Sequence, residues 1–268
     1  MYLPIGIFGN YKGLVRTIEY QKRGLPHLHL LLFLDNYHGN FATADHIDQL
    51  ISAELPDRLR EPELYEIVSK CMMHGPCGFH NPKSPCMKED SLGNSICSKQ
   101  YPKKFHPTTV VNNDGYPTYR RRMDGRTHTV QLSSFNYQPF MMDNTWVVPY
   151  NPYLTKKYKA HINVEVCASV RAIKYINKYI YKGSDQTTVE MSRETDEIKK
   201  YLSGRYISPV EAVWRLMEFP MHEEFPTVYQ LPVHLPGEQP IVFDTNATPD
   251  EIATLLDNSE SMLMGFFR

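Results

Sequence analysis

The alternation of apolar and polar positions predicts a β-hairpin near the start of the chain. Residues 17–35 contain two strand-like runs, with Gly24 and Pro26 marking a turn between them. The second run is apolar enough for a strand in the middle of a sheet. This hairpin is the first element that we expect to organise the fold.

The same patterning predicts further strands and several helices. Strands are expected at 146–150 and 161–167, and Asp124-Gly125 predicts a hairpin between 116–123 and 126–132. Helix signals occur at 44–54 after Thr43, 62–72 from Pro62, 169–181 up to Gly183, 194–202, 209–219 after Ser208, and from Thr248 onward. We therefore expect an α+β fold, an antiparallel sheet flanked by helices.

The overall composition says little about function, but the distribution of charge along the chain suggests a kind of partner. The 268 residues are 41% hydrophobic and 22% charged, which is typical of globular proteins. No apolar run approaches the length of about 18 residues that a membrane helix needs, and the start does not resemble a signal peptide. The net charge of −1 conceals a basic stretch over 99–126, which favours a polyanionic partner. Its cations are Lys99, Lys103, Lys104, Arg120, Arg121, Arg122 and Arg126.

Four of the five cysteines lie between positions 71 and 97, which favours a metal site in a reducing compartment over disulfides. His74, Cys77, Cys86 and Cys97 supply one imidazole and three thiolates, a set that suits tetrahedral Zn²⁺. Cys71 and His80 are alternative ligands. Residues 71–107 form a loop-rich insert with little core of its own, so we expect a structural zinc that holds Lys103 and Lys104 near DNA.

His27 and His29 are separated by one residue of the predicted strand. Both imidazoles therefore leave the same face of the sheet, about 7 Å apart along the strand. Alone, such a pair is more often two core histidines than a metal site. Glu19 and Gln21 share a face of the preceding strand, and either one could add an oxygen ligand for a divalent cation.

Tyr175 and Tyr179 lie one turn apart on the predicted helix 169–181, on the side opposite its aliphatic stripe. Packing against a second partner is the ordinary role of such tyrosines. The alternative is that the phenols are nucleophiles, with Lys178 and Lys182 favouring the phenolate and binding phosphates. Together with the histidines, they would form a site that cuts nucleic acid through a covalent phosphotyrosine.

Two segments give the chain a family resemblance. Glu19-Tyr-Gln-Lys-Arg-Gly-Leu-Pro-His-Leu-His29 and Lys174-Tyr-Ile-Asn-Lys-Tyr-Ile-Tyr-Lys-Gly183 resemble the replication-initiator domain of Helitron transposases, often labelled helitron helicase-like. His74-Gly-Pro-Cys-Gly, Cys97-Ser-Lys-Gln-Tyr-Pro-Lys and Glu211-Ala-Val-Trp-Arg fit the same family. That domain belongs to the His-hydrophobe-His endonuclease superfamily, which includes rolling-circle replication initiators and relaxases.

The resemblance implies a mechanism and its residues. His27, His29 and Gln21 would hold Mg²⁺ or Mn²⁺, although Glu19 would be the stronger ligand. Tyr175 and Tyr179 would cleave single-stranded DNA at transposon ends, leaving a 5′-phosphotyrosine and a free 3′-hydroxyl. The activity implied is that of an endonuclease and strand transferase in rolling-circle transposition.

The resemblance also divides the chain. A nuclease-like domain is expected over 1–205 with upstream strands missing, and it would contain the zinc insert. Residues 206–268 would form a helical and extended region leading toward a helicase that this chain lacks, because no Gly-x-x-x-x-Gly-Lys-Ser/Thr phosphate loop is present. A truncated, inactive remnant that only binds DNA is the alternative function.

Arg120, Arg121 and Arg122 are expected to bind phosphates from the hairpin that Asp124-Gly125 predicts. Tyr116 and Tyr119 would be available to stack on bases. A solvated charged hairpin accounts for these residues nearly as well.

We expect the protein in the nucleus, without a membrane partner.

Overall fold

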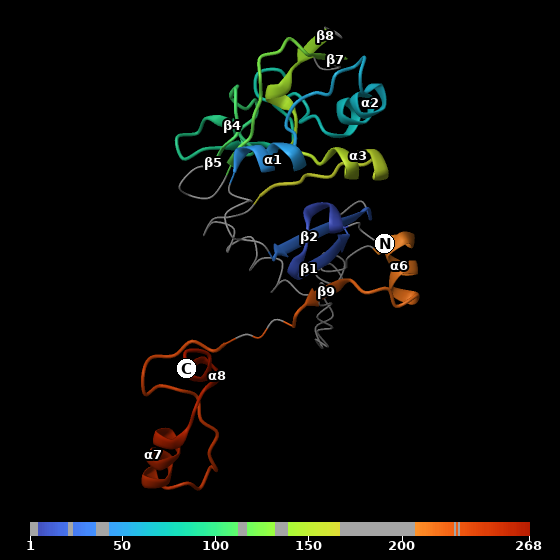
Figure 1. The fold of residues 1–268 in the computed structure, drawn as a ribbon. Coiled ribbons are helices and arrows are strands. Elements are labelled where there is room, and N and C mark those ends of the chain that lie inside the picture. Colours follow the sequence, from blue (N-terminus) through green and yellow to red (C-terminus); the bar gives the residue numbers. More distant parts are fainter. Residues whose placement is uncertain are drawn as a thin grey trace, which may run out of the picture.

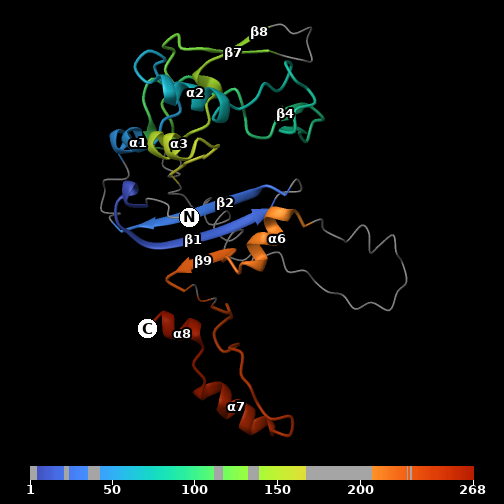
Figure 2. The same ribbon diagram turned by 90° about the vertical axis from the view of Figure 1, so that its right-hand side faces the viewer.

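The computed structural model describes residues 5–20, 24–35, 43–111, 117–131, 139–166, 207–227, 229 and 231–268. These residues form helices and small antiparallel sheets, so the expected mixed α+β class is confirmed. Figures 1 and 2 show a three-stranded sheet beside a body that contains α1, α2 and α3. Among the described residues, no helix is both long and apolar enough to span a bilayer.

The predicted hairpin is present. Strands β1 (Tyr11–Tyr20) and β2 (Pro26–Leu34) pair antiparallel, following the short 3₁₀ helix η1 (Ile5–Phe8). A strand that the sequence did not predict, β9 (His222–Phe225), pairs with the other edge of β1 and completes the sheet order β2-β1-β9. Arg16 faces Glu223 across this pairing, and their side chains form an ion pair of 2.7 Å.

Three helices pack in the body formed by residues 43–166. They are α1 (Ala44–Leu50), α2 (Pro62–Cys71) and α3 (Pro152–Tyr158). The Thr43 hydroxyl caps α1 as expected, but the helix ends early because the backbone of Ser52 pairs with that of Tyr150 instead. Asn151 caps α3, and its side-chain oxygen accepts a hydrogen bond from Leu154 N.

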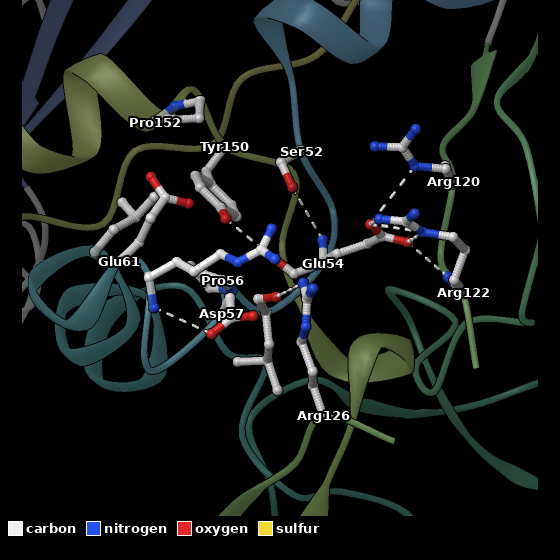
Figure 3. A pocket seen from close by; sticks show the side chains of 13 residues that line it. Ser52, Glu54, Pro56, Asp57, Glu61, Arg120, Arg122, Arg126, Tyr150 and Pro152 are labelled. Carbon is white, nitrogen blue, oxygen red and sulfur yellow. Dashed lines mark hydrogen bonds and ion pairs between the residues drawn. The ribbon is translucent and has the colours of Figure 1, made fainter. Parts of the chain in front are cut away.

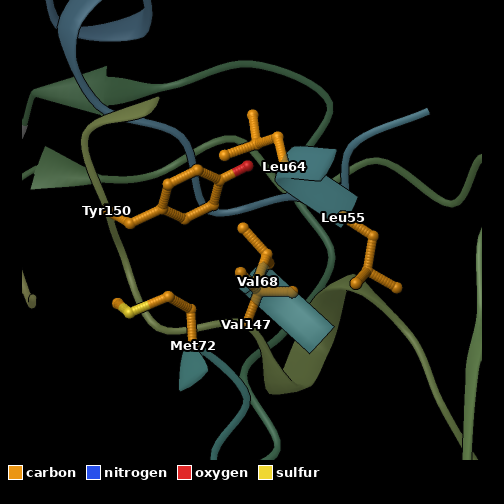
Figure 4. Close-up of a cluster of buried hydrophobic side chains, with 6 residues drawn as sticks. All are labelled: Leu55, Leu64, Val68, Met72, Val147 and Tyr150. Carbon is orange, nitrogen blue, oxygen red and sulfur yellow. The ribbon is translucent and has the colours of Figure 1, made fainter. Parts of the chain in front are cut away.

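The core of this body lies between α2 and the segment after the 3₁₀ helix η3 (Asn144–Trp146) (Figure 4). Leu64, Val68 and Met72 recur at four-residue spacing, so they lie on one side of α2 and meet Val147 and Tyr150. Each fully buried aliphatic side chain contributes roughly 1.5–3 kcal/mol. This core anchors the C-terminal end of α2, from which the cysteine-rich insert begins.

Several strand predictions were wrong in this body. No hairpin forms about Asp124-Gly125: β6 (Pro117–Thr118) pairs with β5 (Val110–Val111), and β7 (His128–Gln131) pairs with β8 (Pro139–Met142). The run 146–150 makes only isolated bridges, through Val147 and Tyr150, and 161–166 contains no strand. Local turn signals were overridden here by contacts between distant segments.

The C-terminal helices begin where their caps predict. Ser208 caps α6 (Pro209–Leu216), and Thr248 with Glu251 forms a reciprocal capping box at α7 (Pro249–Asn258). A short helix, α8 (Met262–Phe266), follows. The predicted helices at 169–181 and 194–202 lie outside the described residues.

Candidate metal centre

The four predicted zinc ligands come together although they span 24 positions of loop-rich sequence. His74 and Cys77 follow α2, Cys86 precedes β3 (Met87–Glu89), and Cys97 ends β4 (Ser95–Cys97). Because β3 and β4 pair with Met87 opposite Cys97, the hairpin returns the last cysteine to the first two ligands. The ligand atoms of all four residues lie within 4.8 Å of one another.

The surroundings of the cluster decide the protonation of its ligand atoms. Burial, followed by the charges of Lys103 and Lys99, lowers the pKa of His74, so its imidazole is neutral at pH 7 and able to act as a ligand. Burial, together with hydrogen bonds to Cys97 and Cys86, raises the pKa of Cys77 to about 12. Burial opposes the ionisation of Cys97, but backbone N–H groups of Tyr101 and Lys99 hold its pKa below the ordinary value.

This arrangement can bind a divalent metal such as zinc. Tetrahedral coordination with Zn–S bonds of about 2.3 Å places ligand atoms roughly 3.5–4 Å apart, and Cys97 Sγ is already 3.6 Å from His74 Nε2. Three sulfurs this close cannot all be thiolates without a cation, because their charges repel. The remaining candidates, Cys71 and His80, are engaged elsewhere: Cys71 Sγ lies 4.0 Å from Lys159 O, and the His80 ring packs on Phe140.

Aromatic rings surround the imidazole ligand. The His74 ring stacks on Tyr101 with ring centroids 4.2 Å apart, and on its other neighbour Trp146 at 6.4 Å. Trp146, Cys77 and Cys97 belong to one buried cluster. These contacts fix the orientation of the imidazole before any metal binds.

The sheet histidines form a second candidate site. His27 and His29 extend from one face of β2 with their ring centroids 4.5 Å apart. Glu19 lies opposite His27 on β1, and its Oε2 atom is 3.7 Å from Nε2 of His29. Two imidazoles and a carboxylate are a donor set that suits a divalent cation, whereas Gln21 lies outside the described residues.

Comparison with known families bears on this second site. Residues 1–32 match the family model of the Helitron helicase-like domain at the N-terminus. This segment, about an eighth of the chain, is similar to the start of a Helitron helicase-like domain. The match confirms the resemblance over β1, the turn and most of β2, including both histidines. No curated protein matches the chain. A Helitron-related domain indicates a transposon-associated function.

Strand β9 adds groups to the Helitron-related hairpin that sequence reasoning missed. His222 lies opposite Thr17, which in turn lies opposite His29, so all three occupy one face of the sheet. The Thr17 hydroxyl is 2.9 Å from His222 Nδ1, and His222 Nε2 is 3.5 Å from Glu224. The alternating positions of His222 and Glu224 were the only local sign of a strand here. Nothing in the sequence indicated its pairing with β1, because the paired residues lie about two hundred positions apart.

The predicted nucleophiles cannot be placed against the Helitron-related hairpin. Tyr175, Tyr179, Lys178 and Lys182 lie outside the described residues, so their roles stay predictions.

The arginine segment differs from the predicted surface ribbon. Arg121 is only 4% exposed, and its Nη1 donates to the carbonyls of Ala53, Asn144 and Val147 at 2.6–3.2 Å. Arg122 forms a bidentate pair with the buried Glu54 carboxylate, which Arg120 also contacts (Figure 3). Arg120 forms a second ion pair with Asp48. Tyr119 is buried, and its hydroxyl accepts a hydrogen bond from Val166 N.

The prediction of an exposed ribbon is therefore wrong, because Arg121 and Tyr119 serve the interior. DNA contacts by Arg120 and Arg122 stay predictions. Of the two predicted lysines, Lys104 is exposed, whereas Lys103 is half-buried with its ammonium 5.1 Å from the centre of the Tyr101 ring. Burial, together with the charge of Arg121, lowers the pKa of Lys103.

Proposed function

We propose that this chain is the strand-cleaving part of a Helitron-type transposase, acting on single-stranded DNA at transposon ends. The observation that carries the proposal is the shared face of His27, His29 and Glu19 within the segment that matches the Helitron family. These three residues would hold Mg²⁺ or Mn²⁺, with Gln21 as the alternative oxygen ligand. The bound ion would polarise the scissile phosphate.

The proposed chemistry uses tyrosine nucleophiles. The phenolic oxygen of Tyr175 or Tyr179 attacks the phosphorus, and the 3′-oxygen of the upstream nucleotide leaves and takes up a proton. The products are a 5′-phosphotyrosine and a free 3′-hydroxyl. Lys178 and Lys182 would favour the phenolate and bind neighbouring phosphates. A second tyrosine would allow a second strand transfer before the first DNA end is released.

The metal centre has a separate, structural part in this proposal. His74, Cys77, Cys86 and Cys97 would hold Zn²⁺ and thereby close the insert 71–107. Since short segments with little core depend on such a staple, the zinc would keep Lys103 and Lys104 in place near the DNA backbone. The nuclease-type fold, the domain division at about residue 205, the separate helicase partner and nuclear location belong to the same proposal.

One assay tests the activity. The purified chain is incubated with a labelled single-stranded oligonucleotide and Mn²⁺, denatured, and examined for a protein–DNA adduct. We expect an adduct that disappears in Tyr175→Phe/Tyr179→Phe and in His27→Ala. The control Tyr153→Phe changes an exposed tyrosine on α3 and should leave the adduct intact. DNA binding without an adduct, under any divalent metal, would instead identify a remnant that only binds DNA.

A further inference from the structure

A tight turn in the zinc insert presents an aromatic side chain to solvent. Asn81 N donates to Gly78 O at 3.1 Å, so Phe79 and His80 occupy the corner of the turn. Gly78 has φ +64°, a conformation that favours glycine, and its N–H is 3.2 Å from Met87 Sδ. The turn lies between Cys77 and Cys86, two residues of the candidate metal centre. Phe79 is 83% exposed there.

The exposed ring is the outer end of a continuous series of aromatic contacts. Phe79 meets His80 edge-on with ring centroids 5.8 Å apart, and His80 packs on Phe140 at 4.2 Å. Phe140 then contacts Trp146 at 5.7 Å, which stacks beside the metal ligand His74. Because each ring supports the next, the outer rings are held in place without losing their exposed faces.

The insert that carries Phe79 and His80 is rich in cations. Residues 71–107 contain Lys83, Lys88, Lys99, Lys103 and Lys104 against only Glu89 and Asp90. Four of these lysines are exposed, and the fifth is half-buried over Tyr101. An exposed ring on an insert rich in lysines matches the two parts of a nucleotide: bases stack on aromatic faces and phosphates pair with ammonium groups.

We propose that the Phe79–His80 corner is a stacking site for an unpaired base of single-stranded DNA, supported from behind by Phe140. The inference rests on the proposed function for the identity of the nucleic acid. It adds a contact surface outside the sheet that carries His27 and His29. It also gives the zinc centre a direct consequence for binding, since the metal ligands hold the corner in place.

Substitutions that separate stacking from general hydrophobicity test this site. Fluorescence anisotropy with a labelled thymidine oligonucleotide measures Kd at fixed salt. Since stacking of one base is worth a factor of roughly 5 to 150 in affinity, Phe79→Ala and Phe79→Leu should both weaken binding by a factor in that range. Phe79→Trp should preserve it. The matched control is Leu92→Ala, because Leu92 is 84% exposed on the same insert, in the turn between β3 and β4.

Two further readouts define the outcome. Zinc content should be unchanged in every variant, and Phe79→Ala should keep the slope of log Kd against log salt, because it removes no phosphate contact. If Phe79→Leu binds DNA as tightly as the wild type, or if Leu92→Ala loses as much affinity as Phe79→Ala, the stacking proposal is overturned. Formation of the protein–DNA adduct tests the cleavage proposal separately. No binding of single strands by the wild type would refute both proposals. Phe79-dependent binding without an adduct would refute the cleavage proposal alone.

Discussion

Replacing Arg121 by Met should destabilise the fold far more than it weakens DNA binding. Its guanidinium lies inside the body of residues 43–166, where a single nitrogen donates to three backbone carbonyls. Those carbonyls belong to two separate segments, around Ala53 and around Asn144 to Val147. Methionine has a similar reach but no donor, so it would leave the three carbonyls without this partner.

The magnitude follows from these contacts. A hydrogen bond to a charged group contributes roughly 1.5–3 kcal/mol. The carbonyl of Val147 also accepts from the Tyr101 hydroxyl, and that of Asn144 from Val147 N, each at 3.4 Å, so these two keep a long hydrogen bond when Arg121 is replaced. Because one nitrogen serves all three acceptors, the contributions do not add fully. We expect Arg121→Met to lower the free energy of unfolding by about 3–5 kcal/mol. Arg58→Met is the matched control: Arg58 is exposed and lies over the Tyr65 ring, which predicts a loss of about 0.5–1 kcal/mol.

Urea unfolding followed by tryptophan fluorescence measures both changes. DNA affinity is compared under conditions where each variant is folded. A midpoint for Arg121→Met equal to that of Arg58→Met would refute the interior role of Arg121. If Arg121→Met keeps its stability but loses much of its DNA affinity, the result would instead support the contact between Arg121 and phosphate that the sequence alone predicts. If Arg121→Met does not fold, Arg121→Lys can be measured in its place. Lysine keeps the charge but lacks the planar guanidinium, so we expect a smaller loss of stability than for methionine.

The metal centre and the buried carboxylate give two more predictions. Purified protein should hold about one equivalent of Zn²⁺ in the insert, and calorimetry of zinc binding in buffers of different ionisation enthalpy should show proton release. The raised pKa of Cys77 means that its thiol must lose a proton, so zinc affinity should fall as pH falls; pH-independent affinity would contradict this. Burial opposes ionisation of Glu54, but hydrogen bonds from Arg122 and the charge of Arg120 hold its pKa below the ordinary value. Its stabilising effect should therefore be present at neutral pH and lost as pH falls below about 4.3. Denaturation of Glu54→Gln against wild type should show a smaller acid dependence, and an equal dependence would exclude this pair as the cause.

The parts of the fold that sequence reasoning anticipated depend on local chemistry. Thr43, Ser208 and Thr248 cap helices because each accepts a hydrogen bond from an N–H only three positions away. The hairpin of β1 and β2 joins neighbouring segments and carries a clear turn signal. The four residues of the candidate metal centre could be found because cysteine and histidine are scarce residues, and a cluster of them within a short segment is typical of a metal site.

The rest depends on long-range contacts that leave no local pattern. Asp124-Gly125 has the sequence of a hairpin turn, but Asn144 Nδ2 donates to Arg122 O and to Asp124, which ties this segment to a distant one. Arg121 resembles its neighbours in sequence and differs only in the carbonyls that surround it. Pairing of β9 with β1 requires closure across about two hundred residues, so the row of Thr17, His29 and His222 could not be predicted.

The position of the label in the covalent product tests the cleavage proposal most directly. Two oligonucleotides of one sequence, labelled at the 3′ or the 5′ end, are incubated with the protein and Mn²⁺ and separated under denaturing conditions. A 5′-phosphotyrosine predicts that only the 3′ label migrates with protein, while the 5′ label appears on a shortened strand with a free 3′-hydroxyl. Peptide mapping should then find nucleotides on Tyr175 or Tyr179. Label on protein from the 5′-labelled strand, or an adduct that persists in Tyr175→Phe/Tyr179→Phe, would contradict the proposal.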